Sequence, residues 1–188
     1  MGVRVTLLSA ARSSSVLDVR FGDDRPLDGA GRAEVRRAAP GFASLCTAEL
    51  RYCSPTARCR ETCEGVGVDA IAQPALRDCD MGRWRGSTLH EVAARDPGGV
   101  DVWLADPYAA PHGGEPLMSF ISRVGSWLDT RPAAAGDRVV AVAEPGVVRA
   151  ALCYVLRVPP HVYWRVDARP LSAVVFAGRA GEWRLSLA

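Results

Sequence analysis

The sequence predicts an α/β fold: a three-layer αβα sandwich with a mostly parallel central sheet and an antiparallel edge. Short apolar, strand-like runs alternate with helical segments along the chain, which is typical of this class. The run Arg-Val-Val-Ala-Val-Ala at 138–143 is continuous and β-branched, as a central parallel strand buried on both faces should be. Segment 170–188 has the pattern of two strands joined around Gly178 to Gly181, which indicates the antiparallel edge.

The first half of the chain supplies the other expected strands and three helices. Strands are expected at 3–8, at 49–54 and at the start of the irregular segment 70–86, with a polar loop over 9–27. The three helices are each expected behind a capping side chain: about 29–39 behind Asp28, Pro55 to Gly65 or Gly67 behind Ser54, and 87–97 behind Ser87 or Thr88.

The second half of the sequence predicts a loop-rich insertion, followed by two helices on either side of the central strand. The insertion covers 99–116, and the apolar spacing of 117–131 predicts a helix. A turn and a helix over 144–158 follow the central strand. No repeat or low-complexity linker divides the chain, and 188 residues suit one domain, so we expect a single domain over 1–188.

Composition excludes several classes of function. All 23 basic residues are arginines, so no lysine is available as a nucleophile or for a Schiff base. The net charge is +2 and no dense basic run occurs, which argues against a nucleic-acid partner. No apolar run reaches the length of a membrane span, and the chain begins directly with a strand pattern, so we expect a cytoplasmic protein. We expect no cofactor, a small molecule as the partner, and a monomer or homodimer.

Six cysteines raise the question of a disulfide framework or a metal site. The chain has enough aliphatic residues to fold without disulfides, and it contains no Cys-x-x-Cys pair. Cys59 and Cys63 would share one face of a helix, but the spacing matches no zinc pattern. We therefore predict reduced structural thiols and no metal site, with a soft-metal cluster as the alternative.

Several segments occur in an order that resembles a known family. They are, from the N-terminus, Pro-Leu-Asp-Gly-Ala-Gly-Arg-Ala-Glu, Ser-Pro-Thr-Ala-Arg, Leu-Arg-Asp-Cys-Asp-Met-Gly-Arg-Trp-Arg-Gly, Leu-His-Glu-Val, Pro-His-Gly-Gly-Glu-Pro and Val-Val-Ala-Val-Ala-Glu-Pro-Gly-Val-Val-Arg-Ala-Ala-Leu. Over nearly its whole length the chain is similar to the phosphoglycerate mutase-like branch of the histidine phosphatase superfamily. The resemblance implies a phosphoglycerate mutase-like sandwich.

The resemblance also implies a particular catalytic pocket. In the family, an Arg-His-Gly tripeptide after the first strand supplies an arginine and the nucleophilic histidine. A second arginine comes from a Ser-Pro-x-x-Arg helix, a second histidine follows the central strand, and an acidic residue protonates the leaving group. Positive groups must surround a phosphoryl group because its negative charge is spread over three oxygens.

The positions of this chain that match the pocket depart from the pattern. Ser9 occupies the arginine position, Ala10 the nucleophile position and Ala11 the glycine position. Glu144 stands where the second histidine is expected, while the arginine of the Ser-Pro helix is retained as Arg58. The resemblance therefore predicts a family member that lacks both catalytic histidines.

Two further positions match the family more closely. The acid position falls at Asp78, where the family usually has glutamate, and Arg149 matches a position on the helix after the second histidine. Glu144 would place a negative charge where phosphate should bind, and a unit charge pair at about 4 Å is worth roughly 4 kcal/mol at an effective dielectric near 20. We expect Arg58 to form an ion pair with Glu144, which would make its guanidinium unavailable to a bound anion.

These substitutions favour a ligand-binding or regulatory pseudophosphatase. We predict Arg58, Ser9, Arg12 and Ser13 as ligand contacts, with Arg12 equally able to reach the cleft or to point to solvent. Trp103 and Tyr108, in the insertion, are expected to pack in a lid or to line the pocket.

Two enzymatic alternatives stay open. One is changed acid/base chemistry in the same cleft, carried by Glu144, Asp78 and His112. The other is a residual phosphatase with Ser9 or Ser13 as nucleophile and Glu144 as base. Convergence of Glu144, Asp78 and His112 on an open pocket would favour changed chemistry, whereas a pocket sealed by Arg58 and Glu144 would favour the pseudophosphatase.

Overall fold

The central sheet has six strands in the order β3-β2-β4-β1-β5-β6. A computed structural model of the chain describes residues 2–13, 19–131 and 137–187. Strands β1, β2, β3 and β4 are parallel, whereas β5 is antiparallel to β1 and β6 to β5. The predicted mostly parallel sheet with an antiparallel edge is therefore confirmed. The strands are β1 (Val3–Ser9), β2 (Leu50–Cys53), β3 (Ile71–Ala72), β4 (Arg138–Ala143), β5 (Ala173–Gly178) and β6 (Arg184–Ser186).

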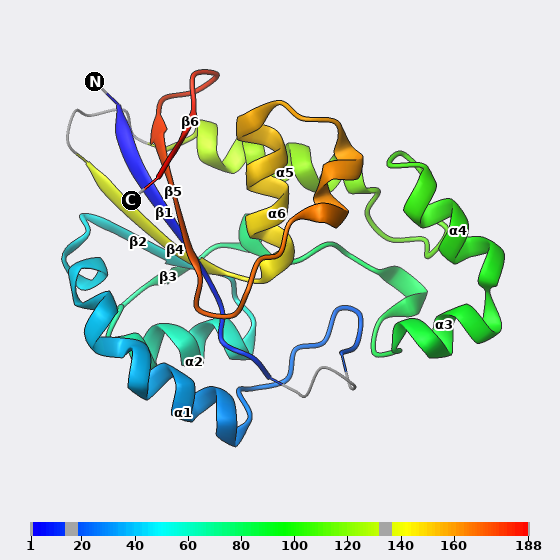
Figure 1. Cartoon of the computed structure of the whole chain (residues 1–188), viewed down its shortest axis with the longest axis horizontal. Helices are drawn as coiled ribbons and strands as arrows, with labels where there is room; N and C mark the ends of the chain where they lie inside the picture. Colours follow the sequence, from blue (N-terminus) through cyan, green and yellow to red (C-terminus); the bar gives the residue numbers. More distant parts are fainter. Residues whose placement is uncertain (1, 14–18, 132–136, 188) are drawn as a thin grey trace.

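Helices cover both faces of the sheet and form the outer layers of the sandwich (Figure 1). Helices α1 and α2 lie on one face and α5 and α6 on the other, while α3 and α4 stand beside the sheet. The α-helices are α1 (Gly29–Ala38), α2 (Ala57–Val66), α3 (Leu89–Arg95), α4 (Pro97–Ala105), α5 (Leu117–Asp129) and α6 (Pro145–Leu156). Short 3-10 helices are η2 (Ala39–Thr47), η3 (Pro74–Leu76), η4 (Gly82–Trp84) and η5 (Pro160–Arg165).

The two faces of the sheet carry separate hydrophobic cores because side chains alternate along each strand. Val5 and Leu7 of β1 pack with α5 and α6, while Leu8 of the same strand packs with α1 and α2. Strand β4 alternates in the same way, with Val139 and Ala141 in the first core. Both central strands are thus buried on both sides, which fixes their register.

Two of the expected helix caps are confirmed by their hydrogen bonds. The Asp28 carboxylate accepts a hydrogen bond from the Gly31 N–H at 2.6 Å and begins α1. Thr88, one of the two candidates for α3, forms a reciprocal capping box with Glu91.

The cap predicted for α2 is wrong. The helix begins at Ala57, later than the expected start at Pro55, and the Ser54 hydroxyl does not cap it. Instead, the hydroxyls of Ser54 and Thr56 both donate to Glu144. The free Ala57 N–H is satisfied by Asp24 of the preceding loop, at 2.7 Å.

The insertion predicted as loop contains helix α4. Asp96 caps it by accepting a hydrogen bond from the Gly99 N–H at 3.0 Å, and Pro97 occupies the first helical turn. This N-cap and the proline in the first turn are enough to start the helix. None of the helices in the described ranges is long and apolar enough to cross a membrane.

The pairing of β1 with β4 places two loop starts side by side. Ser9 is in register with Ala143, and the Ala10 N–H donates to the Ala143 carbonyl at 2.8 Å. The Ser54 N–H donates to the Val142 carbonyl at 2.8 Å, so the end of β2 joins the same edge. Residues that follow these three strands must therefore meet at one edge of the sheet.

Gly125 allows α5 and α6 to approach closely, and this contact can be tested. A Cβ at Gly125 would lie 2.2 Å from the Tyr154 ring, which is held in place by a hydrogen bond from its hydroxyl to Asp129 at 2.7 Å. We predict that Gly125→Ala lowers the free energy of unfolding by about 1–3 kcal/mol, measured by urea denaturation. Gly98→Ala in α4 has no atom within 4 Å of the new Cβ and serves as the control. An unchanged stability for Gly125→Ala would contradict this packing.

Candidate functional site

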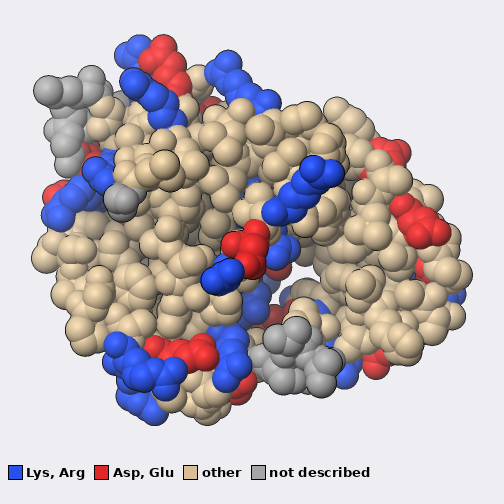
Figure 2. Space-filling model, viewed as in Figure 1, with Lys and Arg blue, Asp and Glu red and all other residues tan. Residues whose placement is uncertain are grey.

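A cleft of about 550 Å³ opens at the carboxyl edge of the parallel strands. Figure 2 shows this face hollowed near its centre, where basic and acidic side chains meet. Four segments line the cleft: the loop at 20–24, the start of α2, the connection 74–85 and the turn at 113–115. Arg123 and Glu144 complete the lining.

Glu144 forms the floor of the cleft at the end of β4. Its side chain is buried, with 1% of the residue exposed. One carboxylate oxygen, Oε1, accepts hydrogen bonds from Ser54 Oγ at 3.2 Å and from Thr56 Oγ1 at 2.5 Å. The other oxygen, Oε2, is buried and has no hydrogen-bond partner in the part of the chain that the structure describes.

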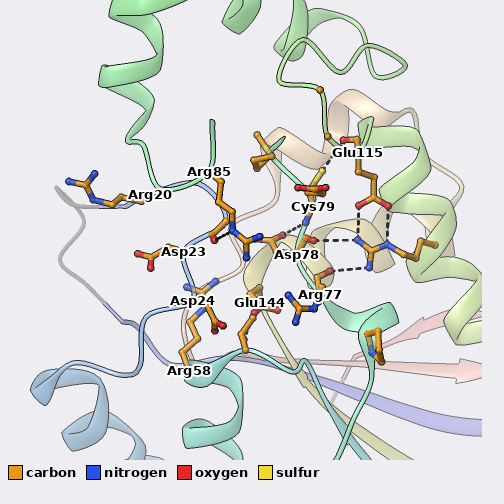
Figure 3. Close-up of a pocket in the computed structure, with 18 residues that line it drawn as sticks. Arg20, Asp23, Asp24, Arg58, Arg77, Asp78, Cys79, Arg85, Glu115 and Glu144 are labelled. Carbon is orange, nitrogen blue, oxygen red and sulfur yellow. Dashed lines mark hydrogen bonds and ion pairs between the residues drawn. The ribbon is translucent and has the colours of Figure 1, made fainter. Parts of the chain in front are cut away.

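Asp78 lies beside Glu144 and is the second carboxylate of the floor (Figure 3). Burial, and then the charge of Glu144, raise the pKa of Asp78 to about 6, against the opposing effect of Arg58. Its Oδ1 accepts a hydrogen bond from the Cys79 N–H at 3.0 Å and lies over Gly146 in the first turn of α6. A side chain at Gly146 would occupy the position of this carboxylate.

Arg58 extends from α2 into the same cleft (Figure 3). Its Nε is buried without a hydrogen-bond partner. The expected ion pair with Glu144 is not formed, because Glu144 is turned to the Ser54 and Thr56 hydroxyls. Within the described parts of the chain the guanidinium makes no ion pair, so the cleft is not sealed across Arg58 and Glu144.

Arg123 holds one wall in place. Its guanidinium donates two hydrogen bonds to Glu115, at 2.9 and 2.7 Å, and further bonds to the carbonyls of Ala75, Arg77 and Asp78. Such a fork satisfies several acceptors at once because its donors are fixed in one plane. Arg123 therefore fixes the backbone that carries Asp78.

The opposite wall is the loop at 20–24. Asp24 caps α2, and Gly22 accepts a hydrogen bond from Arg85 Nε at 3.1 Å. Asp23 forms an ion pair with Arg25. The loop is thus attached to α2 on one side and to the residues after η4 on the other, which leaves the space between them open.

The charge of the lining is nearly balanced. Five arginines and six carboxylates line the cleft: Arg20, Arg58, Arg77, Arg85, Arg123, Asp23, Asp24, Asp78, Asp80, Glu115 and Glu144. A pocket built for a phosphoryl group needs an excess of positive groups around it. This lining offers no such excess.

His112 does not join Asp78 and Glu144. Its imidazole is buried, with 1% of the residue exposed, and packs against Trp84 at 5.2 Å between ring centroids. Nδ1 accepts a hydrogen bond from the Gly114 N–H at 3.0 Å, and burial lowers the pKa of the ring. Its loop does reach the cleft, but through Gly113, Gly114 and Glu115 rather than through the imidazole.

The remaining predicted contacts lie on the other side of Arg58. Ser9 is fully buried, and its hydroxyl has no hydrogen-bond partner. Arg12 turns toward α1, where its Nε lies 3.4 Å from Glu34. Arg12 and Ser13 line a second cavity of about 760 Å³ together with Ala10 and Ala11, and Arg58 borders both cavities.

The aromatic residues of the insertion pack away from the cleft. Trp103 lies against Phe21, Trp84 and Trp164, with ring centroids 4.5–5.7 Å apart. Tyr108 is 73% exposed. Neither residue is in the lining of the cleft: Trp103 packs among other aromatic rings, and Tyr108 lies on the surface.

The cysteines show no metal-binding cluster. In the described ranges, no group of three or more His, Cys, Asp or Glu side chains could hold a metal ion. All six cysteines are free, and four of them, Cys53, Cys59, Cys63 and Cys153, are buried. Burial, and then the charge of Glu144, raise the pKa of Cys59 well above its usual value.

Sequence reasoning missed the residues that hold the site. Ser54 was expected to cap the helix and Thr56 had no predicted role, and no pattern indicates that their hydroxyls bind a glutamate about ninety residues away. Arg123 falls inside an amphipathic helix and has no local signal. The Gly-Gly-Glu turn was recognised, and its Glu115 is the partner that Arg123 uses.

Comparison with known proteins gives a family-level match. The family described as the histidine phosphatase superfamily (branch 1) matches residues 14–188. Phosphoserine phosphatase 1 of Hydrogenobacter thermophilus is 29% identical over 122 residues, covering 62% of this chain and 58% of the relative. A glucosyl-3-phosphoglycerate phosphatase of Mycolicibacterium vanbaalenii is 30% identical over 154 residues, covering 72% of this chain and 65% of the relative. The chain thus matches less than two thirds of either relative's length.

Solved structures agree on the fold. The mycobacterial glucosyl-3-phosphoglycerate phosphatase has a TM-score of 0.77 at 24% identity, covering 98% of this chain and 97% of its own. A mutant phosphoserine phosphatase of Entamoeba histolytica in complex with phosphoserine has a TM-score of 0.83 at 16% identity, covering 98% of this chain and 95% of its own. The phosphoglycerate mutase-like fold predicted from the sequence is therefore confirmed.

The raised pKa of Asp78 makes stability depend on pH. Because the folded protein holds the Asp78 proton up to about pH 6 and the unfolded chain releases it near 3.8, the ionised side chain destabilises the fold as pH rises through this range. We predict that Asp78→Asn matches the wild type near pH 4 and is more stable by about 1–3 kcal/mol near pH 7.5, measured by urea denaturation.

A matched control separates this effect from the loss of one surface charge. Asp101 is exposed on α4, and Asp101→Asn removes a carboxylate far from the floor of the cleft. A stability difference between Asp78→Asn and wild type that is equal at both pH values would show that Asp78 is not a desolvated carboxyl group.

Proposed function

Since the chain belongs to branch 1 of the histidine phosphatase superfamily, we propose that it keeps the superfamily's cleft as a binding site without phosphohistidine chemistry. The protein would then be a ligand-binding or regulatory pseudophosphatase. The observation that carries the proposal is the pair of neighbouring strand ends: Ser9-Ala10-Ala11 at the end of β1, where the two alanines line the second cavity, and Glu144 after β4, at the floor of the cleft. We infer that Ala10 stands at the nucleophile position and Glu144 at the second histidine position.

One further finding supports this alignment, although the family match covers residues 14–188 and does not include the tripeptide itself. Strands β1 and β4 are in register up to Ser9 and Ala143, so the residues that follow them are neighbours, as two groups acting on one phosphoryl should be. An alanine side chain cannot form a covalent phosphoryl intermediate.

Glu144 opposes phosphate binding as well as failing to support catalysis. Its carboxylate is buried and fixed by two hydroxyls, so it cannot swing out of the cleft without breaking both hydrogen bonds. A unit charge pair of like sign at about 4 Å costs roughly 4 kcal/mol at an effective dielectric near 20. Arg58 is retained from the family pocket, and the cleft that it lines holds six carboxylates beside its five arginines, Glu144 and Asp78 among them.

The open cleft favours binding over a purely structural role. A cavity of about 550 Å³ remains, lined by Arg58 and Glu144, whose buried Nε and Oε2 atoms have no hydrogen-bond partner among the described residues. Burying a polar atom without a hydrogen-bond partner costs free energy, and a bound molecule would supply the missing partners. The curated relatives are phosphatases by name, and their substrates remain properties of those proteins.

A second candidate function is acid/base catalysis on a substrate without phosphate. The observation that favours it is Asp78, whose pKa of about 6 lies beside a second carboxylate in an open cleft. Two carboxyl groups in different environments are the usual basis of paired acid and base roles. His112 would have no part in such a reaction, because its ring is packed against Trp84 outside the lining.

Phosphatase assays test the main proposal directly. We predict that the full chain hydrolyses phosphoserine, 3-phosphoglycerate and p-nitrophenyl phosphate no faster than a blank, under conditions in which phosphoserine phosphatase 1 of Hydrogenobacter thermophilus is active. Arg58→Ala and Glu144→Ala should leave this background unchanged. Hydrolysis at an ordinary enzymatic rate, on the order of 1–10 per second, that Arg58→Ala abolishes would overturn the proposal.

The fate of a bound molecule distinguishes binding from acid/base catalysis. We predict that any small molecule found to bind the cleft is recovered unchanged after hours with the protein in D2O, as followed by proton NMR. Chemical conversion, or exchange of its carbon-bound hydrogens, that Asp78→Asn suppresses would establish the second candidate function instead.

A further inference from the structure

We infer that the ligand of this cleft is a small zwitterion, carrying a protonated amine for the two floor carboxylates and a carboxylate or similar monoanion for Arg58. The inference rests on the proposed function, in which the cleft binds a molecule without transferring a phosphoryl group. It adds the chemical class of that molecule.

Glu144 defines the amine position. Glu144 lines the cleft; Ser54 and Thr56 satisfy its Oε1, whereas Oε2 is buried and accepts no hydrogen bond from the described residues. A buried carboxylate oxygen needs a hydrogen-bond donor and, better, an opposite charge. An ammonium group supplies both, since it carries three donors and no acceptor.

Asp78 strengthens the same position. Glu144 and Asp78 lie close enough for the charge of one to raise the pKa of the other, and Figure 3 shows them as neighbours at the floor. Asp78 Oδ1 has a single hydrogen bond, from the Cys79 N–H, so it can accept another. Two adjacent carboxylates attract a cation and repel a phosphate dianion.

Arg58 defines the acid position. Its guanidinium enters the cleft next to this floor and forms no ion pair with Glu144. Among the other lining arginines, Arg123 is committed to Glu115 and three carbonyls, and Arg85 to Gly22. Arg77 also lines the cleft and is exposed to solvent there (Figure 3). A carboxylate matches the planar fork of Arg58 and carries one charge, which the lining can balance.

A metal cation would be the competing occupant of two carboxylates, but the site lacks ligands for it. Within the described ranges no third His, Cys, Asp or Glu joins Asp78 and Glu144 as a metal-binding group. The volume of about 550 Å³ is also far larger than an ion requires and lies in the usual range for small-molecule pockets. An organic ligand with two charged ends uses the floor and Arg58 together.

The test measures binding of defined zwitterions to the full chain by isothermal titration calorimetry near pH 7.5. The probes are glycine, β-alanine, 4-aminobutanoate and 5-aminopentanoate, in which the distance between the ammonium and the carboxylate increases stepwise. Pentylamine and pentanoate carry one charge each on a chain of matched length, and inorganic phosphate represents the superfamily's usual ligand chemistry. We expect at least one zwitterion to bind about tenfold or more tightly than either singly charged probe and than phosphate.

Variants locate the binding to the floor. Glu144→Gln keeps the size of the side chain and an acceptor for Ser54 and Thr56 while removing the charge, so it should weaken the best zwitterion by about tenfold or more. Asp78→Asn should weaken it in the same direction and serves where Glu144→Gln unfolds, as judged by circular dichroism. Glu182→Gln, in an exposed ion pair with Arg179, is the control and should bind as the wild type does.

The results separate the two proposals. Phosphate binding more tightly than every zwitterion, binding that Glu144→Gln leaves unchanged, or no binding of any zwitterion would each overturn the inference. The last of these would leave the pseudophosphatase proposal intact if the phosphatase assays stay at background. Hydrolysis of phosphomonoesters would overturn the proposed function whatever the zwitterions do.

Discussion

The cleft depends on one anchored charge: the Glu144 carboxylate held by the hydroxyls of Ser54 and Thr56. This contact joins the end of β4 to the connection between β2 and α2, and it uses the hydroxyls that would otherwise cap the helix. The start of α2 therefore moves to Ala57, and Asp24 supplies the missing acceptor from the loop at 20–24. Arg58, one residue into the helix, then enters the cleft without Glu144 as its partner. These two hydrogen bonds thus determine where α2 starts and where the loop at 20–24 attaches, and they leave the Arg58 guanidinium without Glu144 as a partner.

The cleft stays open because each wall is fixed by contacts within itself and not by contacts across the space. Arg123 binds Glu115 and the backbone that carries Asp78, which secures one wall. The loop at 20–24 is secured by Asp24 on α2 and by Arg85 on Gly22. An ion pair across the cleft between Arg58 and Glu144 would have closed it. The hydroxyls of Ser54 and Thr56 bind Glu144 instead, so the geometry that keeps Glu144 from Arg58 also preserves a cavity.

Patterns that act over short distances predicted the fold well. The β-branched run of β4, the Asp28 and Thr88 caps and the terminal hairpin are set by neighbours in the sequence, and the structure has each of them. The residue types at the cleft edge were also visible, because Glu144 directly follows the strongest strand. The sequence did not predict the hydrogen-bonding partners of Glu144. Glu144 could pair with Arg58 by charge or with two hydroxyls by position, and only the three-dimensional arrangement of β2 against β4 decides between them. His112 shows the same limit, since its neighbour Glu115 faces the site while its own ring packs on Trp84.

Stability alone does not account for a carboxylate at the floor. A buried acceptor without a donor costs about 1–3 kcal/mol, and Asp78 is itself destabilised by the charge beside it. A medium-sized apolar side chain after β4 would avoid both costs and would still end the strand. Two carboxylates and one arginine kept apart in an open cavity store unfavourable electrostatic energy that a bound molecule of complementary charge would release. Sites arranged in this way are more often binding or catalytic sites than remnants of packing. In our proposal, the two carboxylates of the floor select a molecule that brings a positive charge to Glu144.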